Sequence, residues 1–197
     1  MERFRNTGQP DWDWWGKLWP TPGATLRDLG IGAGRSVAEV GCGSGYFALP
    51  AARIVEPAPV YAVDLDAALL DELESLAERQ AIENVVPVRG DARDLTDLLP
   101  ERVDALVVAN TFHGVDDRSG FVEEAFEAVE PGGRLIVVNW HDRPREATTV
   151  GNESRGPPTD LRMGPEETEG AVSRAAPFEL NGRVDLPPYH YALVFER

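Results

Sequence analysis

Three alternate glycines in a five-residue stretch are the first feature of this sequence that could do chemistry. Gly41, Gly43 and Gly45 follow the apolar run 36–40, which is typical of a strand, and precede a helical pattern. Glycine permits a tight turn and lets a ligand approach bare backbone, and the start of the next helix offers free N–H groups and the positive end of its dipole. The stretch predicts a binding loop for a small molecule. Taken alone, it is also compatible with a purely structural turn.

The spacing of the loop limits the kind of ligand. A dinucleotide loop requires G-x-G-x-x-G, and Tyr46 stands where its last glycine would be. The stretch reads instead E-x-G-x-G-x-G from Glu39, and a carboxylate there favours a cationic group, such as an amino-acid ammonium, over a pyrophosphate. This disfavours the alternative of an NAD-dependent oxidoreductase. Cys42 lies between two glycines, where a small residue is required, and this favours packing over a role as nucleophile.

These residues resemble the class I methyltransferases that depend on S-adenosylmethionine (SAM), whose signature is an acid-led glycine loop. The resemblance covers residues 37–140 and implies SAM as the cofactor. It implies that Glu39 faces the methionine ammonium, and that four loop residues approach the rest of the cofactor: Gly41, Cys42, Gly43 and Gly45.

The resemblance assigns four further positions that follow strand-like runs. It implies that Asp64 accepts hydrogen bonds from both ribose hydroxyls, while Leu65 covers one face of the adenine. It also implies that Asp91 accepts from the adenine amino group beside the backbone N–H of Ala92, and that Asn110 lines the sulfonium. The competing role of Asp64 as a helix cap is better filled by Asp66.

Two histidines are candidates for catalysis. Methyl transfer from a sulfonium is an in-line displacement, so alignment supplies much of the rate, and a base is needed only where the acceptor must lose a proton. His113 and His141 both follow strands at the edge where α/β sheets bind ligands, whereas His190 belongs to the terminal strands and is expected to be structural. The histidines lack metal-ligand spacing, so we expect a displacement without a metal.

The acceptor is expected to be a small molecule. DNA amino-methyltransferases carry D/N-P-P-Y/F after the fourth strand, where this chain reads ANTF, and a net charge of −15 repels nucleic acid and anionic membranes. The single cysteine excludes the several metalloid ligands of arsenite methyltransferases. Sequence leaves open which atom is methylated, and whether the tryptophans at 12, 14, 15 and 19 form a lid or a packed cluster.

Composition suggests the setting of the protein. There are 34 acidic and 19 basic residues, Lys17 is the only lysine, and such a surface resembles that of halophilic proteins. One cysteine indicates a reducing compartment, so we expect a cytoplasmic protein. No apolar run is long enough to cross a bilayer.

Strand-like and helical segments alternate along the chain, which predicts an α/β fold: a Rossmann-like, doubly wound sheet of seven strands, mostly parallel with an antiparallel C-terminal pair. The strands are expected at 36–40, 60–64, 85–89, 105–109, 134–139, 181–187 and 191–197. Helices are expected over 66–80, around 121–129 up to Pro131-Gly132-Gly133, and over 166–176, and Pro50 should bend or shorten the helix after the glycine loop.

We expect a single domain over residues 1–197. Its parts would be an N-terminal aromatic lid or cover segment (1–33), a cofactor-binding core (34–142), and a terminal part (143–197) with a long polar loop at 143–165. The main alternative in function is a SAM-binding protein without transferase activity, which shares the cofactor motifs and differs only in turnover.

Overall fold

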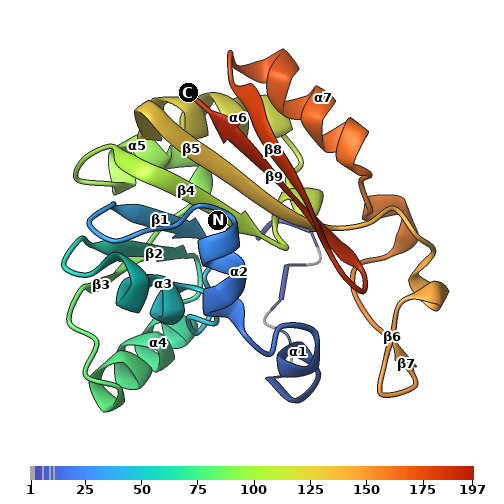
Figure 1. Cartoon of the computed structure of the whole chain (residues 1–197), viewed down its shortest axis with the longest axis horizontal. Helices are drawn as coiled ribbons and strands as arrows, with labels where there is room; N and C mark the ends of the chain where they lie inside the picture. The colour runs from blue at the N-terminus through green and yellow to red at the C-terminus, as the bar shows by residue number, and fades with distance from the viewer. Residues whose placement is uncertain (1–2, 6, 9, 11) are drawn as a thin grey trace.

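A central sheet organises the molecule (Figure 1). The structure, a computed structural model, describes residues 3–5, 7, 8, 10 and 12–197, so parts of the expected cover segment, residues 1, 2, 6, 9 and 11, lie outside the described residues. The seven strands have the order β3-β2-β1-β4-β5-β9-β8. They are β1 (Val37–Val40), β2 (Val60–Asp64), β3 (Val85–Arg89), β4 (Val103–Ala109), β5 (Val129–Trp140), β8 (Glu179–Leu186) and β9 (His190–Glu196).

Strand directions confirm the predicted fold class. β3, β2, β1, β4 and β5 pair in parallel, and β9 runs antiparallel to both β5 and β8. This is the Rossmann-like arrangement with an antiparallel C-terminal pair that the alternating sequence predicted.

Helices cover both faces of the sheet (Figure 1). One face packs against α2 (Pro22–Asp28), α3 (Ala48–Val55) and α4 (Ala67–Arg79), and the other against α5 (Leu95–Leu98), α6 (Arg118–Ala128) and α7 (Pro165–Ala175). Successive strand residues alternate between the two cores: Val37 points to the first face, and Ala38 and Val40 point to the second. All of β1 is therefore buried, including its one charged residue.

The neighbouring strands β1 and β4 form the topological switch point. The chain leaves β1 toward α3 on one face and leaves β4 toward α6 on the other. The two connections diverge at the carboxyl ends of these strands and leave a crevice there, which is where open α/β sheets bind ligands. The glycine loop and Asn110 lie at these two strand ends.

Two expectations about this part of the chain need correction. Helix α6 ends at Ala128, and β5 begins at Val129 and runs through Pro131-Gly132-Gly133. Pairing of Val129 with Val103 extends the sheet here, and Gly133 allows the close approach, since a Cβ there would lie 2.9 Å from the carbonyl oxygen of Asp104. Pro50 lies in the first turn of an eight-residue helix; its missing N–H there breaks no intrahelical bond.

The segment 143–165 contains more structure than the expected polar loop. It folds into a small hairpin, β6 (Thr149–Val150) and β7 (Glu153–Ser154), between the short 3₁₀ helices Arg145–Ala147 and Thr159–Leu161. In Figure 1 the hairpin projects beyond the carboxyl edge of the sheet, near α1 (Trp12–Leu18). In the described part of the chain, no helix has the length and apolar character needed to span a membrane.

Candidate cofactor and acceptor site

The glycine loop is held against β2 by its own backbone. The N–H groups of Gly41 and Cys42 both donate to the carbonyl oxygen of Val63, at 2.9 and 3.2 Å. Gly41 has a φ of +70°, and a Cβ there would lie 2.6 Å from Thr111 Oγ1. A side chain at this position would meet both backbone strain and a steric clash, so the turn requires glycine.

Two carboxylates face this loop from the ends of β1 and β2. Glu39 is buried, and its Oε2 has no hydrogen-bond partner among the described residues. Burial raises the pKa of Glu39 well above its usual value, and the nearby charge of Asp64 raises it further. The backbone of Ala48 provides one hydrogen bond to this carboxyl, so its unpaired oxygen is the one poised to receive a cationic group.

Asp64 is fixed by two backbone donors. Its Oδ2 accepts from the N–H of Gly43 at 2.9 Å, and its Oδ1 accepts from the N–H of Asp66, also at 2.9 Å. The cap of α4 is Asp66, whose side chain accepts from Ala68 N–H at 3.0 Å. Asp64 is therefore not needed as the cap, and each of its oxygens retains a lone pair for a ligand hydroxyl.

Cys42 is a packed, protonated residue. Burial raises the pKa of its thiol, and the negative charges of Glu39 and Asp64 add to this effect. Its Sγ donates to the carbonyl oxygen of Gly43 at 3.4 Å. Because the thiolate is the reactive form, these surroundings disfavour the alternative of a cysteine nucleophile.

Asn110 has an unusual backbone at the end of β4. Its φ is +55°, a region in which asparagine is enriched, and its N–H donates to Val138 O at 2.8 Å. Both atoms of its side-chain amide are buried without a hydrogen-bond partner among the described residues. Strained backbone with unpaired polar atoms is typical of functional sites.

Two adjoining cavities occupy the switch point. The larger has a volume of about 280 Å³ and the smaller about 40 Å³. Both are lined by Thr7, Gly41, Asp64 and Thr111, so they meet beside the Asp64 carboxylate.

Most residues predicted from the sequence line these cavities. The larger cavity is bordered by Glu39, Gly41, Cys42, Gly43, Asp64, Asn110 and His113. The smaller one is bordered by Gly41, Asp64, Leu65, Asp91 and Ala92. Gly45 lines neither and packs instead near Leu73 and Leu49.

The three histidines have different surroundings. His113 is buried in the 3₁₀ helix Phe112–Gly114 and borders the larger cavity. His141 borders neither cavity, and its Nε2 lies 3.1 Å from Asp185 Oδ1, which counts against the predicted catalytic role. The ring of His190 lies 4.1 Å from that of Trp140, and burial lowers its pKa well below the usual value, so it is a neutral packing residue.

Sequence reasoning missed part of the cavity lining. The larger cavity is also bordered by residues that were not anticipated: Thr7, Gly8, Pro10, Tyr46, Phe47, Leu69, Trp140, Gly156 and Pro157. Ala109 and Thr111, beside Asn110, and Trp14 and Trp15, of the expected lid or packed cluster, border it as well. Trp140 ends β5 at the same carboxyl edge, so the rule that selected His141 could have selected it. Trp15 also packs into the core beneath α1, so the tryptophan cluster contributes both to packing and to the cavity wall.

Comparison with known proteins places the chain in a family. Residues 38–137 match a family model described as "Methyltransferase domain". A Methanosarcina mazei protein named "Probable cobalt-precorrin-6B C(15)-methyltransferase (decarboxylating)" is 32% identical over 115 residues, which span 58% of this chain and 60% of that protein.

Solved structures share the fold. A SAM-dependent methyltransferase from Aquifex aeolicus superposes with a TM-score of 0.76 at 21% identity, covering 88% of each chain. One from Mesorhizobium loti has a TM-score of 0.69 at 19% identity and covers 91% of this chain and 100% of its own. The family match implies SAM as the cofactor. The chain thus belongs to the methyltransferase-domain family.

Proposed function

We propose that this chain is an enzyme that transfers a methyl group from SAM to a small-molecule acceptor by in-line displacement. The observation that carries the proposal is the buried Glu39 carboxyl: this residue borders the larger cavity, and its Oε2 has no hydrogen-bond partner in the described residues. The α-ammonium of an amino acid would pair with it and offset its desolvation.

The residues around the junction of the cavities fit the rest of the cofactor. Asp64 would accept from the ribose hydroxyls, with its oxygens already oriented by Gly43 and Asp66. Asp91 and Ala92 border the smaller cavity and would receive the adenine, next to Leu65. These assignments follow the direction of the two cavities from the carboxyl end of β1 to that of β3.

The chain's contribution to the reaction is orientation and exclusion of water. Bound SAM supplies a methyl group on a positively charged sulfur. Asn110 and Thr111 border the larger cavity from the end of β4, and the strained backbone of Asn110 directs its amide to a fixed place. His113, in the same wall, would take up the proton of an acceptor that must lose one.

The walls of the larger cavity favour a flat acceptor without negative charge. Trp14, Trp15 and Trp140 border it together with Pro157, and such faces accommodate planar aromatic or heteroaromatic groups. Glu39 and Asp64 border the same space, so an anionic acceptor would meet like charge. The net charge of −15 also disfavours a nucleic acid acceptor.

The setting of the enzyme is part of the proposal. The core 34–142 and the terminal part 143–197 contribute strands to one sheet, which supports a single domain. The lone, buried Cys42 thiol is compatible with the cytoplasm.

Turnover of SAM to S-adenosylhomocysteine is the direct test. The protein is incubated with methyl-labelled SAM and a panel of uncharged, cationic and anionic heteroaromatic acceptors, and the labelled product is identified. We expect methylation confined to uncharged or cationic acceptors, and its loss in Asp64→Asn. Tight binding of SAM without turnover on any acceptor or cell extract would favour the alternative of a SAM-binding protein. Binding of NAD in place of SAM would overturn the whole proposal.

A further inference from the structure

A short N-terminal segment crosses the carboxyl edge of the sheet. We call its described residues 3–5, 7 and 8 the strap. The N–H of Arg5 donates to Gly114 O at 3.0 Å, and Arg3 pairs with Asp66 Oδ2 at 2.8 Å. Within the strap, Thr7 Oγ1 donates to the carbonyl oxygen of Phe4 at 2.7 Å. These contacts hold the strap to both sides of the switch point.

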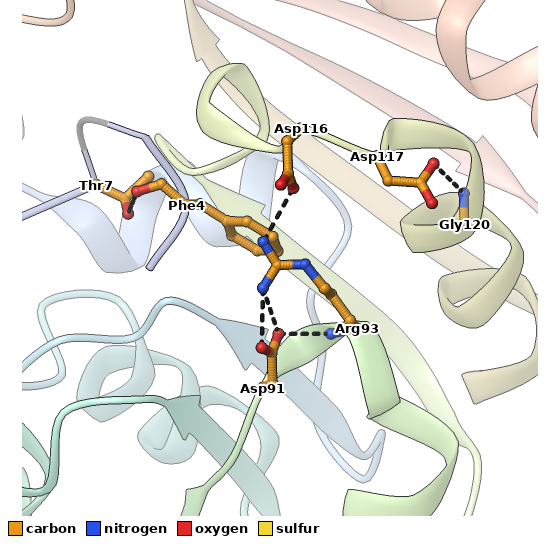
Figure 2. A network of polar contacts seen from close by, with 7 residues as sticks. All are labelled: Phe4, Thr7, Asp91, Arg93, Asp116, Asp117 and Gly120. Atoms are coloured by element: carbon orange, nitrogen blue, oxygen red, sulfur yellow. Dashed lines mark hydrogen bonds and ion pairs between the residues drawn. The ribbon is translucent and has the colours of Figure 1, made fainter. Parts of the chain in front are cut away.

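Phe4 anchors the strap in the second core. Its ring is buried and meets the ring of Phe121 edge to face, at 6.0 Å between centroids. The guanidinium carbon of Arg93 lies 4.4 Å from the centroid of the Phe4 ring (Figure 2). Such a cation–π contact strengthens when water is excluded.

Arg93 is fixed in turn by two carboxylates. Its Nη1 donates to both oxygens of Asp91, at 3.0 and 2.8 Å, and its Nη2 donates to Asp116 Oδ1 at 2.9 Å (Figure 2). Hydrogen bonds to Asp116 and Asp91 raise the pKa of Arg93, so it stays charged. The orientation of the guanidinium, and therefore of the Phe4 ring, is linked to the orientation of Asp91.

The strap forms part of the wall of both cavities. Arg3 and Phe4 border the smaller cavity, and Phe4 is the one aromatic residue in the described lining of that cavity. Thr7 borders both cavities where they meet. The strap therefore lies where the smaller cavity, in which the adenine is proposed to bind, joins the larger one.

We propose that the strap closes over the adenine of bound SAM, with Phe4 as one wall of the adenine subsite and Arg93 as the positioning residue that joins Phe4 to Asp91. The inference rests on the adenine placement in the proposed function. On this inference, Phe4 and Arg93 help to retain the cofactor, because the cofactor exchanges only when the strap moves away from the cavity. The ion pairs of Arg93 with Asp91 and Asp116 oppose this movement.

A matched pair of phenylalanine variants tests the strap. Phe126 lies under Arg197 at 4.3 Å, a contact of the same kind, and borders neither cavity. We expect Phe4→Leu to speed dissociation of S-adenosylhomocysteine about tenfold, since one cation–π and one aromatic contact are lost, and Phe126→Leu to leave the rate unchanged. A wild type that fails to bind S-adenosylhomocysteine would overturn the proposed function and the strap with it. Binding with equal rates in wild type and both variants would overturn the strap alone.

Gly114→Ala tests the strap without changing any strap residue. A Cβ at Gly114 would lie 2.1 Å from the carbonyl oxygen of Arg5, and the φ of Gly114 is not in the left-handed region, so alanine strains only the strap contact. We expect S-adenosylhomocysteine to dissociate faster from Gly114→Ala as well. In the wild type, bound S-adenosylhomocysteine should slow hydrogen exchange at the Arg5 amide, and this slowing should be lost in Gly114→Ala. Unaltered exchange of the Arg5 amide on binding to the wild type would overturn the inference.

The role of Arg93 has a readout in cofactor specificity. Arg93→Gln releases Asp91, so the protein should lose about tenfold in its discrimination between S-adenosylhomocysteine and the analogue in which a 6-oxo group replaces the adenine amino group. The control is Arg102→Gln, which removes a comparable arginine–carboxylate pair, with Glu127, outside both cavities. Equal discrimination in the two variants would overturn the positioning role of Arg93.

Discussion

At the scale of single residues, the acids of the site could be anticipated and the strained amide could not. Glu39 was singled out by its charge beside the glycine loop, and Asp64 by the family resemblance. Asn110 was assigned by the family resemblance, but its φ of +55° and its unpaired amide were not anticipated, because no local sequence pattern encodes them. His141 was selected by its place after a strand, and its contact with Asp185 on β8, far along the chain, could not be anticipated from that position.

The Asp64 carboxylate gives the sharpest prediction about affinity. Asp64→Asn keeps the shape and removes the charge, so SAM binding should weaken by about 2–4 kcal/mol, or about thirtyfold and more. Asparagine would also place an N–H₂ group near the N–H of Gly43 or Asp66, which adds a small loss of stability. Titration with S-adenosylhomocysteine and a melting curve on each protein measure both effects. Unchanged affinity in a folded variant would contradict the ribose assignment.

Glu39 makes both stability and binding depend on pH. Its pKa in the folded protein lies well above 4.5, mainly because of burial, so the folded state holds this proton after the unfolded state has released it. The stability of the cofactor-free protein should therefore fall as pH rises from about 4.5 through the raised pKa, and then level off. A cofactor ammonium favours the ionised form, so affinity for S-adenosylhomocysteine should rise over the same interval.

Glu39→Gln isolates this effect. In this variant, neither stability nor affinity for S-adenosylhomocysteine should show the pH dependence described above, and binding at high pH should be weaker than in the wild type. The control Glu130→Gln, at an exposed residue, should keep the wild-type pH dependence. Chemical unfolding and calorimetric titration across the pH range provide the measurements. Identical profiles for wild type and Glu39→Gln would show that Glu39 does not meet the ammonium.

At the scale of elements, buried parallel strands were the most predictable part. The buried strand β2 has the predicted bounds, because a short apolar run flanked by turns admits few other interpretations. The edge strand β3, which is only partly buried, also has the predicted bounds. The predicted start of β5 was wrong. Pro131-Gly132-Gly133 forms an irregular part of that strand between the residues that pair with β4, and its backbone hydrogen bonds go to Arg197 at the end of the chain. The hairpin in 143–165 depends on tertiary contacts of Arg162, which periodicity does not reveal.

Arg162 should determine the stability of that segment. It is buried and donates to Pro157 O at 3.0 Å, Thr148 Oγ1 at 2.8 Å and Arg155 O at 3.0 Å. Arg162→Lys keeps the positive charge but removes the planar guanidinium that makes these hydrogen bonds. We therefore expect a loss of about 1–3 kcal/mol in unfolding free energy. The exposed Arg145→Lys, in the same segment, should cost less than about 1 kcal/mol. Denaturant unfolding of both variants measures this, and equal losses would contradict the role of Arg162.

At the scale of the whole molecule, charge should control stability. The net charge of −15 imposes repulsion on the compact state, and added salt screens it. We expect the melting temperature to rise from low salt to molar potassium chloride, and to rise less in sucrose of matched osmolality. A flat or falling curve in potassium chloride would remove the inference of a salt-adapted protein and leave the methyltransferase assignment untouched.

The two ends of the binding crevice have different structural origins. The proposed cofactor end is built from strand ends and the turns that follow them, which the sheet holds in place, whereas part of the proposed acceptor end comes from α1 and from Gly156 and Pro157 at the periphery. Change in the peripheral segments can therefore accumulate without disturbing cofactor recognition. For evolution this makes acceptor choice the variable trait of the scaffold, and for engineering it makes the segment 143–165 the natural unit to exchange between relatives.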